Sequence, residues 1–142
     1  MRKALKITII LALLALPSAA LAAGSTSQPW AINCMQLKYK PTKITLSCGD
    51  GGTWLGKLKW SNWGQSQAVG TGNFTAINCT PNCAAGHSHS VPVKVTLSKV
   101  KTCPGQVEKS FKQAVLVYQK SRPKGAPLKV SFRCPSGLPQ GY

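Results

Sequence analysis

Strict alternation of apolar and polar residues is the feature that most constrains the fold of this chain. It occurs in residues 44–48, 91–98 and 128–134. Because successive side chains of a β-strand point to opposite faces of the sheet, a period of two predicts half-buried strands. Residues 111–118 are apolar at both parities towards their end, and this pattern predicts a central strand that is covered on both faces.

Helical periodicity is weak throughout the chain. Residues 106–117 offer a helical alternative, but their β-branched content argues against it. Six or seven short strands with turn signals between them predict an all-β fold, a small disulfide-stapled antiparallel β-sandwich. Pro92 cannot donate to a sheet ladder, so its strand is expected to lie at an edge or to begin there.

The first residues have the features of a secretory signal peptide. A basic start precedes an apolar run over residues 7–16, and Ala20-Leu21-Ala22 supplies a cleavage site. The run is shorter than the roughly 20 residues that span a bilayer, so we expect no transmembrane span after signal removal. The expected location is extracellular, including the cell wall. The expected organisation is a signal peptide at 1–22, a flexible N-terminal segment at 23–34 and one β-sandwich domain at 35–142.

Six cysteines follow the predicted signal. An even number in an exported chain predicts disulfides, because that compartment is oxidising. Spacing alone does not choose among the many pairings. A bond between Cys79 and Cys83 would restrict little of the unfolded chain, so we expect both to reach distant partners. The expected pairs are Cys48 with Cys79, Cys83 with Cys103, and Cys34 with Cys134.

A metal site is the alternative interpretation of one cysteine segment. The pattern Cys79-x3-Cys83-x3-His87-x-His89 has the residue types of a zinc or copper site. Its spacing is not that of a zinc finger, and thiolates in an exported protein tend to oxidise. We therefore predict a disulfide-bearing loop with two solvated histidines, and neither a metal nor another cofactor.

The charge balance is strongly positive, with 18 Lys and Arg residues against two Asp and Glu. Three basic residues belong to the predicted signal, which leaves 15 against two and a net charge of about +13. Such a surface attracts polyanions, including anionic cell-wall polymers. The chain has no dedicated nucleic-acid-binding motif. We expect a cationic protein whose partner is an anionic polymer.

Residues 57–63, Lys-Leu-Lys-Trp-Ser-Asn-Trp, interleave basic and aromatic side chains. Parity predicts that Trp54 and Trp60 face the core. Trp63 has the parity of Lys57 and Lys59, so it falls either on the surface beside them or over the end of the sandwich. An exposed ring would stack on a base or sugar while the lysines hold an anion. Three more candidate ligand-binding residues, Lys120, Arg122 and Lys124, lie in a basic loop.

Catalysis has little support in the residues present. Two-carboxylate hydrolysis needs two acids flanking one bond, whereas Asp50 and Glu108 lie in unrelated segments. His87 and His89 lack a G-x-S-x-G nucleophile motif, and the cysteines are expected to be bonded. We predict no catalytic residues and a non-enzymatic binding or structural protein. The alternative is a secreted inhibitor that presents a disulfide-bounded loop to an extracellular enzyme.

The order of motifs from Ile44 to Cys103 resembles that of a family of small secreted actinobacterial proteins. The shared pattern is I-x-L-x-C, then W-x-x-W, then C-x-P-N-C-A and a final cysteine. The resemblance implies export and one compact domain, and it brings no catalytic residues to this chain. The spacing from Cys48 to Trp60 also resembles an immunoglobulin-like sandwich in architecture, although residues 111–118 lack the second cysteine of antibody domains.

Overall fold

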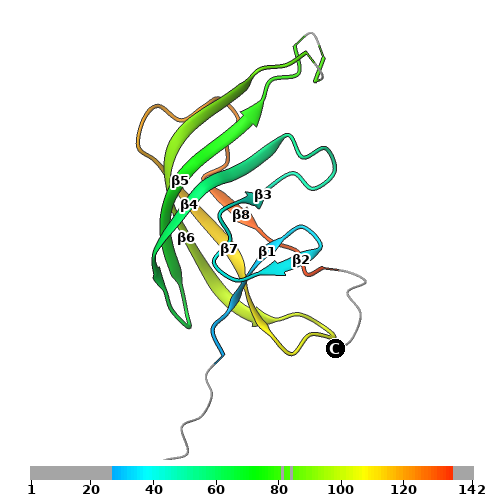
Figure 1. Cartoon of the computed structure of the whole chain (residues 1–142), viewed down its shortest axis with the longest axis vertical. Helices are drawn as coiled ribbons and strands as arrows, with labels where there is room; N and C mark the ends of the chain where they lie inside the picture. Colours follow the sequence, from blue (N-terminus) through cyan, green and yellow to red (C-terminus); the bar gives the residue numbers. More distant parts are fainter. Residues whose placement is uncertain (1–26, 81, 84, 136–142) are drawn as a thin grey trace, which may run out of the picture.

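The computed structural model describes residues 27–80, 82–83 and 85–135. This part of the chain is all-β, with eight strands and no helix (Figure 1). The predicted signal peptide at 1–22 lies outside the described residues. The strands are β1 (Trp30–Asn33), β2 (Gln36–Lys38), β3 (Ile44–Thr45), β4 (Thr53–Trp63), β5 (Ala68–Ile77), β6 (Ser88–Thr102), β7 (Lys109–Tyr118) and β8 (Lys129–Ser131).

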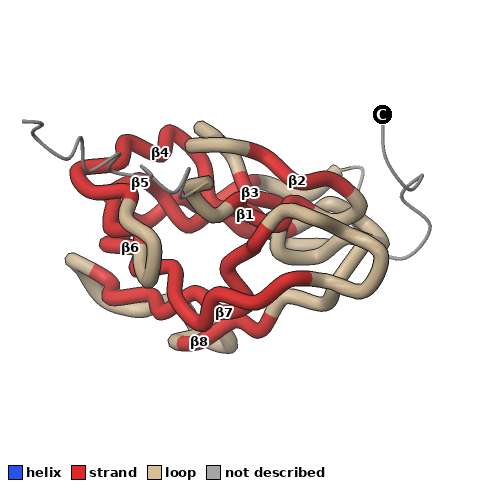
Figure 2. The backbone as a smooth tube through the Cα atoms, turned by 90° about the horizontal axis from the view of Figure 1, so that it is seen from below, coloured by secondary structure: helices blue, strands red, loops and turns tan. Residues whose placement is uncertain are grey.

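All eight strands belong to one sheet, with the order β2-β1-β7-β6-β5-β4-β3 and β8 added beside β7. The sheet is mixed, since β1 and β7 run parallel. It curls into a half-barrel, so that its inner face encloses the core (Figures 1 and 2). The all-β prediction is confirmed, but the expected immunoglobulin-like sandwich is not formed. Because the sheet is strongly curved, it encloses the core by itself, and burial of the core does not require a second sheet.

β7 occupies the middle of the sheet, as its apolar residues at both parities predict. One edge of β7 pairs with β6 along most of its length. The other edge pairs first with β1, at Ser110 and Phe111, and then with β8, from Gln113 to Val115. Because β1 and β8 share one edge of β7, the two strands part at this point and leave a fork in the sheet.

β4 contains two β-bulges, which change the direction of its side chains. It holds one residue more than β5 between Gly56 and Lys59, and again between Trp60 and Asn62. Each extra residue shifts the alternation by one position and increases the local twist. The β4 side chains that pack in or against the core are therefore Leu55, Leu58, Trp60 and Trp63. The prediction that Trp54 faces the core is wrong.

Two glycines in β5 allow the bulged strand to lie close to its neighbour. A Cβ atom at Gly70 would lie 2.7 Å from the Lys59 carbonyl oxygen and 2.8 Å from the Trp60 ring. At Gly72 it would lie 2.6 Å from the Gly56 carbonyl oxygen. Any side chain at these two positions would push β4 away, so the glycines permit the sharp curvature of the sheet here.

The N-terminal boundary of the folded part differs from the expected one. Residues 23–34 are expected to be flexible, yet Trp30–Asn33 form β1 and pair with β2 and β7. Ala31 and Ile32 are buried. The flexible-segment prediction is therefore wrong for the end of that range, because a parallel partner on β7 supplies the contacts that the local sequence does not reveal.

Pro92 lies inside β6, between β5 and β7, and not at a strand start or an edge. Its carbonyl oxygen accepts a hydrogen bond from the amide of Gln119, the residue just beyond β7. The N–H and C=O of a strand residue point to the same neighbour. The missing N–H therefore falls at the last position of the β6–β7 ladder, where its loss affects one terminal bond.

All six cysteines are bonded, as expected, but every expected pair is wrong. The pairs are Cys34–Cys48, Cys79–Cys83 and Cys103–Cys134, separated by 14, 4 and 31 residues. The argument from loop length fails because the fold, and not the entropy of the unfolded chain, decides which sulfurs meet. β1 lies near β3, and the ends of β6 and β8 approach from opposite sides of β7.

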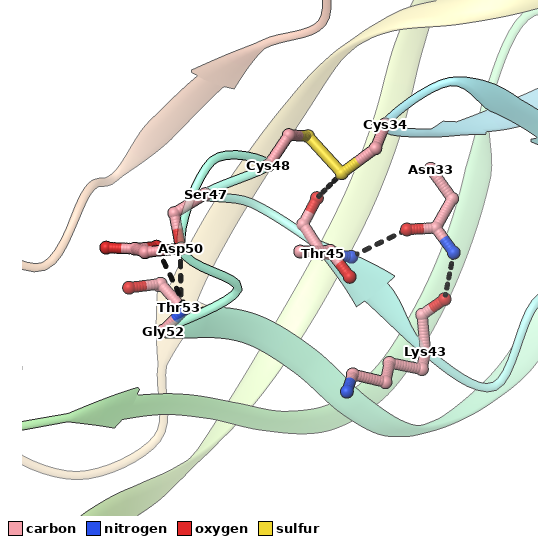
Figure 3. Close-up of a disulfide and its surroundings, with 9 residues drawn as sticks. All are labelled: Asn33, Cys34, Lys43, Thr45, Ser47, Cys48, Asp50, Gly52 and Thr53. Atoms are coloured by element: carbon pink, nitrogen blue, oxygen red, sulfur yellow. Dashed lines mark hydrogen bonds between the residues drawn. A yellow bond between two sulfur atoms is a disulfide. The ribbon is translucent and has the colours of Figure 1, made fainter. Parts of the chain in front are cut away.

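A short polar and covalent bridge joins β1 to β3, which lie near opposite ends of the sheet (Figure 3). The Thr45 amide donates to Asn33 Oδ1 at 2.9 Å, and Asn33 Nδ2 donates to the Lys43 carbonyl oxygen at 3.4 Å. The adjacent Cys34–Cys48 disulfide fixes the same two segments. The Asn33 side chain thus takes the place that a neighbouring strand would occupy.

Asn33→Ala is expected to lower the free energy of unfolding by about 1–3 kcal/mol, because it leaves the Thr45 amide without its acceptor. Asn33→Asp keeps that acceptor and should lose less. Urea unfolding measures both changes, and amide exchange at Thr45 should quicken in the alanine variant alone. Unchanged exchange at Thr45 would contradict the bridge.

Candidate functional site

The outer face of β4, β5 and β6 carries exposed lysines. Lys59 of β4 pairs with Thr71 of β5, and Thr71 pairs with Lys94 of β6. All three side chains are exposed. Neighbouring strands lie about 4.8 Å apart, so the backbones that carry the two lysines are about 10 Å apart on the same face. The chain's two acids, Asp50 and Glu108, lie in turns outside these strands.

Trp54 adds an aromatic ring to this face. Because Gly56 has no side chain, the Trp54 ring lies over it, and a Cβ there would lie 3.2 Å from ring atoms. The Lys43 ammonium lies 4.7 Å from the ring centroid, within cation–π range. Exposed Lys57 occupies the adjacent bulge with a φ of 51°. We define the outer lysine cluster as Lys43, Trp54, Lys57, Lys59 and Lys94.

Trp63 does not belong to this surface. It is only 8% exposed, and its Nε1 donates to the Pro29 carbonyl oxygen at 2.9 Å. Its ring makes edge contacts with Tyr39, Trp60 and Phe111. The interpretation that Trp63 is an exposed stacking ring is therefore wrong, and burial leaves it no face to offer a ligand.

Sequence parity missed Trp54 as the aromatic residue beside the lysines. The signal that would have found it lies in the next strand, where Gly70 and Gly72 occur at a spacing of two. Paired glycines on the inner side of a strand permit close approach of a bulged neighbour. The bulge between Gly56 and Lys59 places Trp54 on the face opposite to Trp60, and the bulge between Trp60 and Asn62 places Trp63 on the same face as Trp60.

The basic loop after β7 lies on the other side of the sheet from the outer lysine cluster. Residues 123–127 border a hollow with Phe74 and Ala76, whose side chains face inwards. Arg122 donates to the Ala126 carbonyl oxygen at 3.3 Å, while Lys120 and Lys124 are exposed. The structure therefore does not bring this loop and Lys59 into one site.

The cysteine and histidine segment forms the end of the β5–β6 hairpin. Cys79 and Cys83 are bonded to each other, so neither sulfur is a thiolate available to a metal. His87 and His89 are exposed, and the His87 amide donates to Asn78 Oδ1 at 2.7 Å. Among residues 27–80, 82–83 and 85–135, no group of three His, Cys, Asp or Glu side chains can hold a metal ion.

A pocket of about 400 Å³ opens at the fork between β1 and β8. It is mostly apolar and is bounded on a third side by the chain around β3. We call it the fork pocket. Its lining residues include Ile32, Met35, Leu46, Val130, Phe132 and Arg133, together with Cys34, Cys48 and Cys134.

Lys112 lies against the disulfide that forms one wall of this pocket. Its Nζ donates to Cys134 Sγ at 3.0 Å and to Cys103 Sγ at 3.6 Å. Burial lowers the pKa of the Lys112 amine, and repulsion from Lys101 lowers this pKa further. This lysine is held by the disulfide, and it is separate from the outer lysine cluster.

The fold and these surfaces define a class: an all-β protein with one curled mixed sheet and three disulfides. Comparison with protein-family models, with curated proteins and with solved structures finds no match to this chain. No residue role is therefore transferred from another protein. The described part contains no helix long and apolar enough to cross a membrane. The three disulfides are compatible with an extracellular location.

Proposed function

We propose that this chain is an exported, non-enzymatic binding protein that attaches to anionic polymers through the outer lysine cluster. The observation that carries the proposal is the shared outer position of Lys59 and Lys94 beside Trp54, on strands that contain no acid. Exposed lysines that share one face of the sheet, on strands without acidic residues, attract polyanions over a Debye length of about 10 Å.

The spacing of the cluster suits an extended polymer better than a single small anion. Lys59 and Lys94 are separated by one strand, and exposed Thr71 lies between them. Lysine binds phosphate, carboxylate or sulfate as a point charge and requires no fixed geometry. A chain of repeated anions can therefore contact both lysines, while the Trp54 ring offers a surface for an uncharged part of the polymer.

The double variant Lys59→Gln/Lys94→Gln tests this function against Lys120→Gln/Lys124→Gln, which removes the same charge from the basic loop. With long-chain polyphosphate as the probe, the first variant should bind about 10-fold more weakly at low salt, while the second changes affinity less than about 3-fold. The slope of log affinity against log salt should fall by about 1.5 in the first variant. Fluorescence anisotropy over a salt series measures both quantities.

Two outcomes would reject the proposal. Equal losses in the two double variants would show that polyphosphate responds to net charge and has no preferred face. Wild-type binding that does not weaken between low and high salt would exclude electrostatic attachment altogether, because released counterions must make the affinity salt-dependent.

The inhibitor alternative is supported by one feature of the fold. The β5–β6 hairpin extends beyond the body of the sheet, and the Cys79–Cys83 bond lies at its end (Figure 1). A saturable one-to-one complex with a secreted hydrolase, lost in Cys79→Ala/Cys83→Ala and kept in Lys59→Gln/Lys94→Gln, would favour that alternative over polymer binding.

A further inference from the structure

We propose that the fork pocket binds a small amphipathic anion, with an apolar chain or ring inside the pocket and one carboxylate or sulfonate at Arg133. The inference is independent of polymer binding, because the outer lysine cluster contributes no residue to the pocket.

The pocket follows from the strand pairing around β7. β1 pairs with β7 up to Phe111, and β8 pairs with it from Gln113 onwards. Two strands that share one edge cannot both continue along it, so they separate and leave space between them. Ligands commonly bind where neighbouring strands diverge, because the backbone leaves a crevice there that side chains only partly fill.

The lining is apolar and partly open to solvent. Ile32 is buried, Leu46 and Phe132 are half-buried, and Met35 is 50% exposed. Met35 is one of few large apolar side chains left so exposed in the described residues. An exposed methionine beside an apolar pocket can adapt its shape to a flexible or irregular hydrocarbon. The volume of about 400 Å³ lies within the range of small-ligand sites.

Disulfide bonds fix the positions of the pocket walls. Cys34 and Cys48 line it and are bonded to each other, and Cys134 lines it while bonded to Cys103. The Asn33 hydrogen bonds fix the same end of β1. A site preformed in this way loses little free energy to ordering when a ligand enters.

Arg133 supplies the charge selectivity. It is the one charged residue of the pocket lining, it is exposed, and no acid lines the pocket. A guanidinium group binds a carboxylate or sulfonate through two parallel hydrogen bonds, which suits an anion held at the rim. Apolar walls with one cation at the rim favour an anionic amphiphile over a cationic or fully polar ligand.

Dodecanoate and its neutral analogue dodecanol are suitable probes, measured by displacement of 1-anilinonaphthalene-8-sulfonate from the full chain. The wild type should bind dodecanoate about 10-fold more tightly than dodecanol, because only dodecanoate pairs with Arg133. Arg133→Gln should remove that preference and leave dodecanol binding unchanged. Lys129→Gln makes an equal change of charge at the first residue of β8, which does not line the pocket, and it should keep the preference.

Leu46→Trp provides a second test, because it fills the pocket from the β3 side. Both probes should bind at least 10-fold more weakly, while near-UV circular dichroism shows the native fold. If Leu46→Trp does not fold, the comparison of Arg133→Gln with Lys129→Gln decides the question alone, since both side chains are exposed.

Three results would overturn the inference: equal affinity of the wild type for the two probes, an equal loss in Arg133→Gln and Lys129→Gln, or binding only after deletion of residues 136–142. The last would show that this part of the chain occupies the pocket.

Lys59→Gln/Lys94→Gln should bind dodecanoate as the wild type does, so failure of this site and failure of the polymer site are distinguishable.

Discussion

Trp63→Ala is expected to lower the free energy of unfolding by about 4 kcal/mol or more, whereas Trp54→Ala should lower it by less than about 1 kcal/mol. Truncation of a buried tryptophan costs about 3–5 kcal/mol through lost transfer energy and the cavity left behind. Trp63 is buried and contacts Phe111 and two other aromatic rings. The variant also leaves the Pro29 carbonyl oxygen without its buried donor, which adds to the loss.

The two tryptophans form a matched pair for this measurement, because they lie in the same strand and undergo the same change. Trp54 lies on the outer face under Lys43, where truncation removes a half-exposed ring and one cation–π contact. Urea unfolding of the oxidised proteins gives both free energies. Similar losses in the two variants, or a larger loss for Trp54→Ala, would show that the bulges in β4 do not exist as described.

Cys103→Ala/Cys134→Ala is expected to lower the free energy of unfolding by about 3.5–4 kcal/mol. The bond closes a loop of 31 residues, and the entropy model gives about that value for such a length. Cys79→Ala/Cys83→Ala opens a loop of only 4 residues and should cost about 2 kcal/mol or less. The midpoint of thermal unfolding should fall on the order of 15 °C in the first variant.

The disulfide variants also test the connectivity itself. Mass spectrometry of the non-reduced wild type should show Cys34 linked to Cys48 and Cys103 linked to Cys134. Each double variant should leave the other two bonds intact. Mixed products in the Cys103→Ala/Cys134→Ala variant would contradict the pairing, as would equal loss of stability in the long-loop and short-loop variants.

The strands could be predicted because each depends on a local pattern. Val93, Val95 and Leu97 alternate with polar residues, and they are fully buried on the inner face of β6. The apolar run in β7 predicts a central strand, and β7 pairs on both edges. Such patterns succeed because the two-residue period of a strand is independent of what the strand packs against.

The candidate site could be predicted only in part. Lys57 and Lys59 are exposed, as their parity with polar neighbours indicates. The aromatic residue beside them could not be identified, because one bulge places Trp54 on the face opposite to Trp60 and a second bulge places Trp63 on the same face as Trp60. Lys43 lies just before β3 and Lys94 lies in β6, and only the pairing of strands brings them near Trp54 and Lys59.

The sequence alone determined that this chain is all-β, that its cysteines are all bonded and that its net charge is strongly positive, since each property follows from local pattern or composition. Tertiary structure decided that one sheet curls into a half-barrel, that Trp63 is buried, and that Cys34 meets Cys48. The physical reason is that curvature, bulges and disulfide partners depend on which strands become neighbours. The pairing of β1 with β7 joins residues about 80 positions apart, and no window of local sequence contains both strands.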